Sequence, residues 1–89
     1  MKVTATIIAE NTWTGVLDVA AGFFSLSIKG TFVATVTVQR TYDGTNWGDV
    51  GTFTGQTEQT GQEGSGAKYR AGVKTGDFTS GTIEILLME

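Results

Sequence analysis

Apolar and polar side chains alternate along most of this chain of 89 residues. The alternation is clearest in residues 31–41, and the apolar positions of one face there are Phe32, Ala34, Val36 and Val38. Successive side chains of a strand point to opposite faces of a sheet, so this period predicts a strand with one packed face and one solvated face. The turn segment 43–46 separates it from a second run at residues 47–53. Residues 31–53 are therefore predicted to form a β-hairpin.

The same period predicts further strands at residues 3–9, 13–20, 23–28, 68–75 and 81–88. Short strands separated by turn residues, with no helical period between them, are typical of an antiparallel sandwich or barrel. We expect an all-β fold, a small antiparallel β-sandwich of about seven or eight strands. The pattern leaves Ig-like and jelly-roll topologies open, and it does not decide whether Gly48 or Gly51 marks a bulge in the strand at 47–53.

Residues 55–66 contain no aliphatic or aromatic side chain. A segment that has nothing to bury is expected to be a long mobile loop, so we predict one domain over residues 1–89 with a flexible Gly-rich loop at 55–66. Residues 76–80 are predicted to be a hairpin loop.

Composition narrows the candidate chemistry. The chain has no cysteine and no histidine, and its net charge is −3. It therefore lacks the residues for a disulfide or a thiolate metal site, and also the commonest general base and metal ligand. An acidic chain is unsuited to neutralising phosphates, and no apolar run approaches the roughly 20 residues of a membrane span. We expect no catalytic residues, metal, cofactor, nucleic acid, membrane partner or secretory signal.

Four carboxylates, Asp43, Asp49, Asp77 and Glu84, are the candidates for acid–base chemistry. Such chemistry needs two groups held in one pocket, whereas Asp43 and Asp77 lie in predicted turns, where aspartate bonds its own backbone. The turn at 41–47 is similar to the Asp-box hairpin of sialidase-like propellers, although it is one residue too short and occurs once. That likeness implies a structural turn in which Asp43 and Gly44 shape the bend and Trp47 packs against it.

Aromatic and basic residues offer two further alternatives. Exposed aromatics on a β-sandwich can stack on sugars, so Trp13 and Trp47 are candidates for ligand stacking, with core packing as the competing interpretation. The basic residues of the strand at 68–75 point one way, and the residues are Lys68, Arg70 and Lys74. They form either a solvated face paired across to Glu84 on a neighbouring strand or a docking surface for an acidic partner.

Outward apolar residues are the strongest sign of an interface. Alternation assigns five of them to solvent-facing positions, and they are Ile8, Val16, Val33, Leu86 and Met88. Residues 83–88 are apolar on both faces, which predicts a central or partner-covered strand. A small core gains much from association, so these five are our candidates for a protein interface.

Several short segments together resemble a group of small virion proteins of tailed bacteriophages. The segments are residues 24–30, 36–44, 46–50, 69–70 and 79–81. In that group a Ser-rich strand is followed by a strand ending in Gln-Arg-Ser-Phe-Asp-Gly, a Trp, a Gly/Glu-rich loop, a Tyr-Arg strand and a Ser-Gly hairpin. This chain has Thr41-Tyr42 where Ser-Phe is usual. The resemblance covers most of the chain from about Phe23 onward, and its motifs concern packing and turns.

The resemblance implies a β-sandwich that binds the major capsid protein or another virion protein, as a homo-oligomer for which we expect a trimer. It transfers no catalytic residue. We therefore predict a non-enzymatic capsid decoration (cement) protein, located in the virion and assembled in the host cytoplasm. The alternatives are a head–tail or tail structural component, and a carbohydrate-binding or adhesion module.

Overall fold

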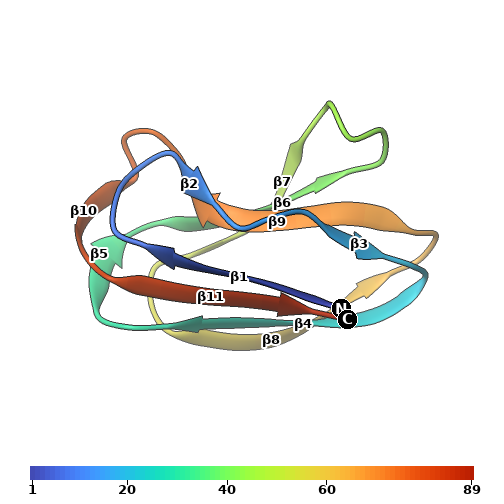
Figure 1. Cartoon of the computed structure of the whole chain (residues 1–89), viewed down its shortest axis with the longest axis horizontal. Coiled ribbons are helices and arrows are strands. Elements are labelled where there is room, and N and C mark those ends of the chain that lie inside the picture. The colour runs from blue at the N-terminus through green and yellow to red at the C-terminus, as the bar shows by residue number, and fades with distance from the viewer.

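Two antiparallel sheets form the two layers of the computed structural model, which describes residues 1–89 (Figure 1). The first sheet has the order β1–β11–β4–β8, and its strands are β1 (Lys2–Ile7), β4 (Gly22–Lys29), β8 (Thr57–Glu63) and β11 (Ile83–Met88). In the second sheet the order is β2–β9–β6–β7, with β3 also paired to β9. Its strands are β2 (Thr12–Trp13), β3 (Leu17–Val19), β6 (Val36–Thr41), β7 (Gly48–Phe53) and β9 (Ala67–Val73). The prediction of a small antiparallel β-sandwich is confirmed.

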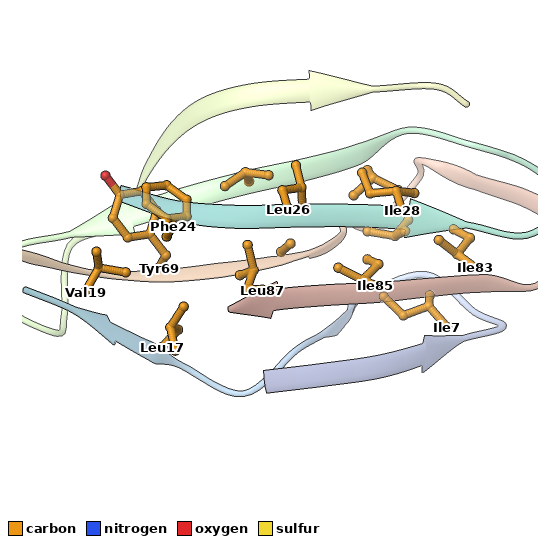
Figure 2. Close-up of a cluster of buried hydrophobic side chains, with 14 residues drawn as sticks. Ile7, Leu17, Val19, Phe24, Leu26, Ile28, Tyr69, Ile83, Ile85 and Leu87 are labelled. Atoms are coloured by element: carbon orange, nitrogen blue, oxygen red, sulfur yellow. The ribbon is translucent and has the colours of Figure 1, made fainter. Parts of the chain in front are cut away.

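The core lies between the two sheets and follows the predicted alternation. On β11, Ile83, Ile85 and Leu87 are buried (Figure 2). The inward positions predicted on β4 and β9 are also buried, namely Phe24, Leu26, Ile28, Tyr69, Ala71 and Val73. β11 lies between β1 and β4, one of the two positions predicted for it, while its outer face stays exposed at Met88.

The predicted strand at residues 13–20 is wrong as a single element, because it divides into β2 and β3. Thr14, between the two, is buried. Its N–H donates to the carbonyl of Ala71 at 2.8 Å, and its hydroxyl accepts from the N–H of Ala71 at 3.1 Å. A side-chain oxygen thus takes the place of a backbone partner, and the regular ladder is interrupted there.

The strand predicted in residues 31–41 also divides, at Thr35. The part before it is β5 (Phe32–Ala34), which leaves the sandwich to pair with β10 (Phe78–Gly81). The N–H of Thr35 donates to the carbonyl of Asp77 at 2.9 Å, which fixes this change of partner. The loop predicted at 76–80 is therefore wrong in part, because most of it is strand. The alternation continues through the break, so the sequence carries no mark of it.

The loop predicted at residues 55–66 is wrong, because its middle is β8, paired with β4 from Thr57 to Glu63. Backbone hydrogen bonds hold this outermost strand, so it needs no apolar side chains of its own. Gly61 lies beneath the ring of Phe24, where an added Cβ would come within 2.5 Å of the ring. The aromatic ring fills the space that an inward side chain of β8 would otherwise occupy.

The irregular strand at residues 47–53 contains a bulge at Val50. Val38 pairs with Gly51 while Gln39 pairs with Asp49, so Val50 is the extra residue. Both glycines proposed as the bulge are therefore one or two positions away from it. No helix in this structure is long and apolar enough to cross a lipid bilayer.

Candidate protein-binding surface

The outer face of the β1–β11–β4–β8 sheet carries a group of outward-facing apolar side chains. Leu86 and Met88 are two residues apart on β11 and point to the same side. Met88 is opposite Ser25 of β4, and Phe23, 67% exposed, lies two residues from Ser25 on that face. Phe23 is thus a diagonal cross-strand neighbour of Met88, within reach of a long side chain. Three apolar residues therefore lie close together on one face of the sheet.

Small uncharged side chains occupy several positions around this group. The neighbouring outward positions are Thr4 on β1, Ser25 and Ser27 on β4, and Thr60 on β8. Charged residues border the group directly. Lys2 of β1 is opposite Met88, Glu84 is two residues before Leu86 on β11, and Lys29 is opposite Glu84. Glu58 of β8 accepts a hydrogen bond from Ser27, which is opposite Leu86. We call the residues Thr4, Phe23, Ser25, Ser27, Thr60, Leu86 and Met88 the Leu86 face. Apolar residues with a polar and charged rim are the usual anatomy of a protein interface.

The five interface candidates do not form one patch. Ile8, 69% exposed, follows the end of β1, and Val16 lies between β2 and β3. Val33, 60% exposed, belongs to β5 in the ribbon with β10. The structure brings only Leu86 and Met88 together. Phe23 was missed as an interface candidate, although the alternation of β4 already places it outward.

A second cluster lies on the outer face of the other sheet. The guanidinium carbon of Arg70 is 4.4 Å from the ring centre of Trp13 and 4.3 Å from that of Trp47. Arg70 Nε also donates to Gln39 Oε1 at 2.9 Å. Each indole therefore has one face against a cation, an arrangement in which the ring quadrupole attracts the charge. Both tryptophans are half-buried, so the two candidates for sugar stacking share one structural cluster.

Lys68 of β9, and Lys74, which follows the last residue of β9, are paired with carboxylates of the same sheet. Lys68 Nζ is 2.5 Å from Asp18 Oδ1, and Lys74 contacts Asp49, which also accepts from Gln39. The predicted pairing with Glu84 is wrong, because Glu84 lies on β11 in the opposite sheet. The sequence could not show that the strands at 68–75 and 81–88 belong to different layers.

Asp43 stabilises the β6–β7 turn through hydrogen bonds to four neighbouring groups. Its carboxylate accepts from the N–H groups of Thr45 and Asn46, both at 2.8 Å, from the Asn46 amide and from the Thr41 hydroxyl. The backbone bonds from Asn46 and Thr45 are the main reason that the pKa of Asp43 lies far below its usual value. Gly44 has φ of 83°, in the left-handed region that favours glycine. The predicted turn role of both residues is confirmed, whereas Trp47 packs on Arg70.

The remaining candidate carboxylates are not gathered for acid–base work. Asp49 is bonded to Lys74 and Gln39 on the second sheet, Asp77 lies in the turn before β10, and Glu84 is on the first sheet. No cavity is lined by two of the four. No group of three or more Asp and Glu side chains is placed to hold a metal ion.

A buried carboxylate lies at one end of the sandwich, where the sequence predicted loop. Glu63 is 3% exposed and accepts from the Tyr69 hydroxyl at 2.6 Å and from the N–H groups of Ser65 and Gly66. Arg40 is 3.9 Å away. The bond from Tyr69 is the main reason that the pKa of Glu63 is lowered, and burial raises the pKa of Tyr69. This cluster closes β8 against β9.

Replacing Glu63 by glutamine is expected to reduce the loss of unfolding free energy on acidification. A carboxyl whose folded pKa is depressed stabilises the fold above its unfolded pKa, and this contribution is lost as the pH falls through the folded pKa. Urea unfolding between pH 7 and about pH 3 should show Glu63→Gln less stable than the parent at pH 7 and losing less on acidification. Glu84→Gln, an exposed control, should follow the parent; equal slopes for parent and Glu63→Gln would contradict the assignment.

An apolar groove opens between β7 and β8, the outermost strands on one side of the two sheets. Its volume is about 220 Å³, and core side chains form part of its lining, namely Phe24, Leu26, Val38 and Tyr69. Val50 and Phe53 line it from β7, and Gln59 and Gly61 from β8. The sandwich is therefore open along this side.

Comparison with known proteins gives no relative from which a site could be transferred: no protein-family model, curated protein or solved structure matches this chain.

Proposed function

We propose that this all-β protein is a non-enzymatic structural protein of a tailed-phage virion, a capsid decoration protein that binds the major capsid protein through the Leu86 face. The observation that carries the proposal is the grouping of Phe23, Leu86 and Met88 on the outer face of one sheet, where Phe23 and Met88 are exposed and Leu86 is half-buried. The resemblance of residues from about Phe23 onward to small virion proteins supports the same role.

The physical work of such a protein is to bury area across a joint between larger subunits. The Leu86 face offers apolar side chains whose removal from water favours binding at about 25 cal/mol per Å² of buried apolar surface. Its serine and threonine hydroxyls can pair with polar groups of a partner, and their short side chains lose little conformational freedom. The charged rim, Lys2 and Lys29 with Glu58 and Glu84, sets orientation more than affinity.

We further propose that the protein acts as a homo-oligomer in the virion, assembled in the host cytoplasm, without metal or cofactor. Several copies held together would engage neighbouring capsid subunits at once, so weak single contacts combine into firm attachment. A role at the head–tail junction or in the tail uses the same surface, and labelling of intact virions with a specific antibody distinguishes these positions by electron microscopy.

A charged substitution in the Leu86 face is expected to abolish capsid binding without unfolding the protein. Leu86→Lys and Met88→Lys place an ammonium group at the centre of the contact, where it must be desolvated. In co-sedimentation with expanded capsids assembled from the major capsid protein of the same genome, both variants should bind at least about 100-fold more weakly than the parent.

The matched control is Val33→Lys, which makes the same type of change at an exposed valine away from this face. It should bind like the parent and raise the thermal stability of capsids equally. If Val33→Lys fails like the Leu86 variant, or the parent neither binds nor stabilises capsids, the proposal is wrong. Quenching of tryptophan fluorescence by a saccharide would instead support the adhesion alternative.

A further inference from the structure

The outer edge of β8 is a free strand edge. β8 pairs with β4 over seven consecutive positions, from Gly22–Glu63 to Ile28–Thr57, with no register shift. On its other side it has no strand neighbour (Figure 1). An unpaired edge presents a row of backbone N–H and C=O groups that can continue the sheet into another chain.

This edge lacks the devices that usually block such pairing. It has no proline, lysine, arginine or bulge, and of its two glutamates Glu63 is buried and already bonded. The edge strand of the second sheet, β7, is interrupted by the bulge at Val50. At the opposite edge of the first sheet, β1 begins with Lys2, and Gly15 of the β2–β3 segment lies against Val3. β8 is therefore less protected than β7 or β1.

We propose that β8 pairs with β8 of a second copy of this chain, antiparallel about a two-fold axis at Thr60. This centred register pairs all seven residues of the strand. It sets Glu58 opposite Gln62 and Glu63 opposite Thr57 of the other copy, so no like charges meet. The Gln62 amide can donate to the Glu58 carboxylate, and Gly61 leaves room for the Gln59 side chain of the other copy. The strand is therefore complementary to itself in charge and in size.

The pairing joins the two first sheets into one sheet of twice the width. A two-fold axis perpendicular to that sheet keeps both Leu86 faces on the same side, so they form one continuous, bivalent surface. The inference specifies the self-association included in the proposed function, and it gives a dimer in place of the trimer expected from the resemblance. Its tests use purified protein without capsids, so either proposal can fail while the other stands.

A single cysteine at residue 60 tests the register directly, because the chain has no cysteine of its own. Residues directly opposite in an antiparallel pair have Cα atoms about 4.5–5.5 Å apart, within the range of a disulfide. Thr60→Cys should therefore form a covalent dimer on mild oxidation. Thr6→Cys, an exposed position on the same face but on β1, is the matched control and should remain monomeric on a non-reducing gel. No dimer of Thr60→Cys, or equal cross-linking of the control, overturns the proposal.

A second measurement tests the dimer without a disulfide. Light scattering over a concentration series should show the parent shifting from monomer to dimer. Thr60→Lys, which places two ammonium groups opposite each other at an exposed position, should weaken dimerisation by about 10-fold or more. Circular dichroism of the variant should remain that of the parent. A parent protein that is strictly monomeric, or that forms trimers unaffected by Thr60→Lys, rules the pairing out.

Discussion

Replacing Leu87 by alanine is expected to lower the free energy of unfolding by about 4 kcal/mol. Leu87 is fully buried on β11, the central strand that β1 and β4 flank, and it points into the core between the two sheets (Figure 2). Shortening it removes the transfer energy of its methyl groups and leaves a cavity that rigid strands on both sides cannot close. Since domains are stable by only about 0.05–0.15 kcal/mol per residue, this is a large share of the total. Urea denaturation followed by tryptophan fluorescence measures it.

The adjacent leucine provides the control. Leu86 has the same chemistry one position earlier, but it faces outward and is only half-buried. Leu86→Ala should cost about 1 kcal/mol or less, since much of its apolar surface is exposed in the folded protein. Similar losses for the two variants would mean that the alternation of β11 between core and surface is wrongly assigned, and the Leu86 face would lose its basis. The two variants therefore distinguish the residue of β11 that stabilises the fold from the residue proposed to bind a partner.

Replacing Gly72 by alanine is expected to destabilise the protein by about 3 kcal/mol. Gly72 is buried on β9 beneath the indole of Trp13. An added Cβ would lie 2.2 Å from the carbonyl oxygen of Thr12 and 2.8 Å from Trp13 Cε3. The first contact is with backbone, so β2 must move away, and Trp13 is then displaced from Arg70. Urea denaturation should show the loss, and near-ultraviolet circular dichroism should show the changed surroundings of the indole.

Gly64→Ala is the matched control, because an added Cβ there meets nothing within 4 Å and the backbone has no positive φ. It should change the free energy of unfolding by less than about 0.5 kcal/mol, as surface substitutions usually do. If Gly72→Ala is as mild as Gly64→Ala, then β2 is free to shift, and the Trp13–Arg70–Trp47 cluster is less firmly held than its geometry indicates.

The alternation of apolar and polar residues predicted the buried side chains correctly for strands that pack one face against the core. The inward positions of β4, β9 and β11 followed from alternation alone, because side chains of a strand must point alternately to its two faces. The Asp43–Gly44 turn followed from residue chemistry, since aspartate bonds nearby N–H groups and glycine accepts a positive φ. The outward direction of Leu86 and Met88 could also be predicted from the sequence, whereas their closeness to Phe23 could not.

The misplaced elements have a common cause. β8 carries no apolar side chain, and only its hydrogen-bonded neighbour β4, far away in the sequence, makes it a strand. The division at Thr35 depends on a bond to Asp77, and the burial of Thr14 depends on Ala71. Each of these is a long-range backbone contact, which leaves no trace in the local alternation of residue types.

By itself, the order of residues determined the all-β class, the faces of the principal strands and the chemistry of the β6–β7 turn, because all three depend on the period and properties of neighbouring side chains. Only the tertiary structure decided which strands share a sheet. It thereby placed Glu84 away from the basic residues of β9, enclosed Glu63 beside Tyr69, and brought Phe23 to Met88 across two strands. Pairing between distant segments is a property of the whole folded chain, and the candidate surface exists only because of it.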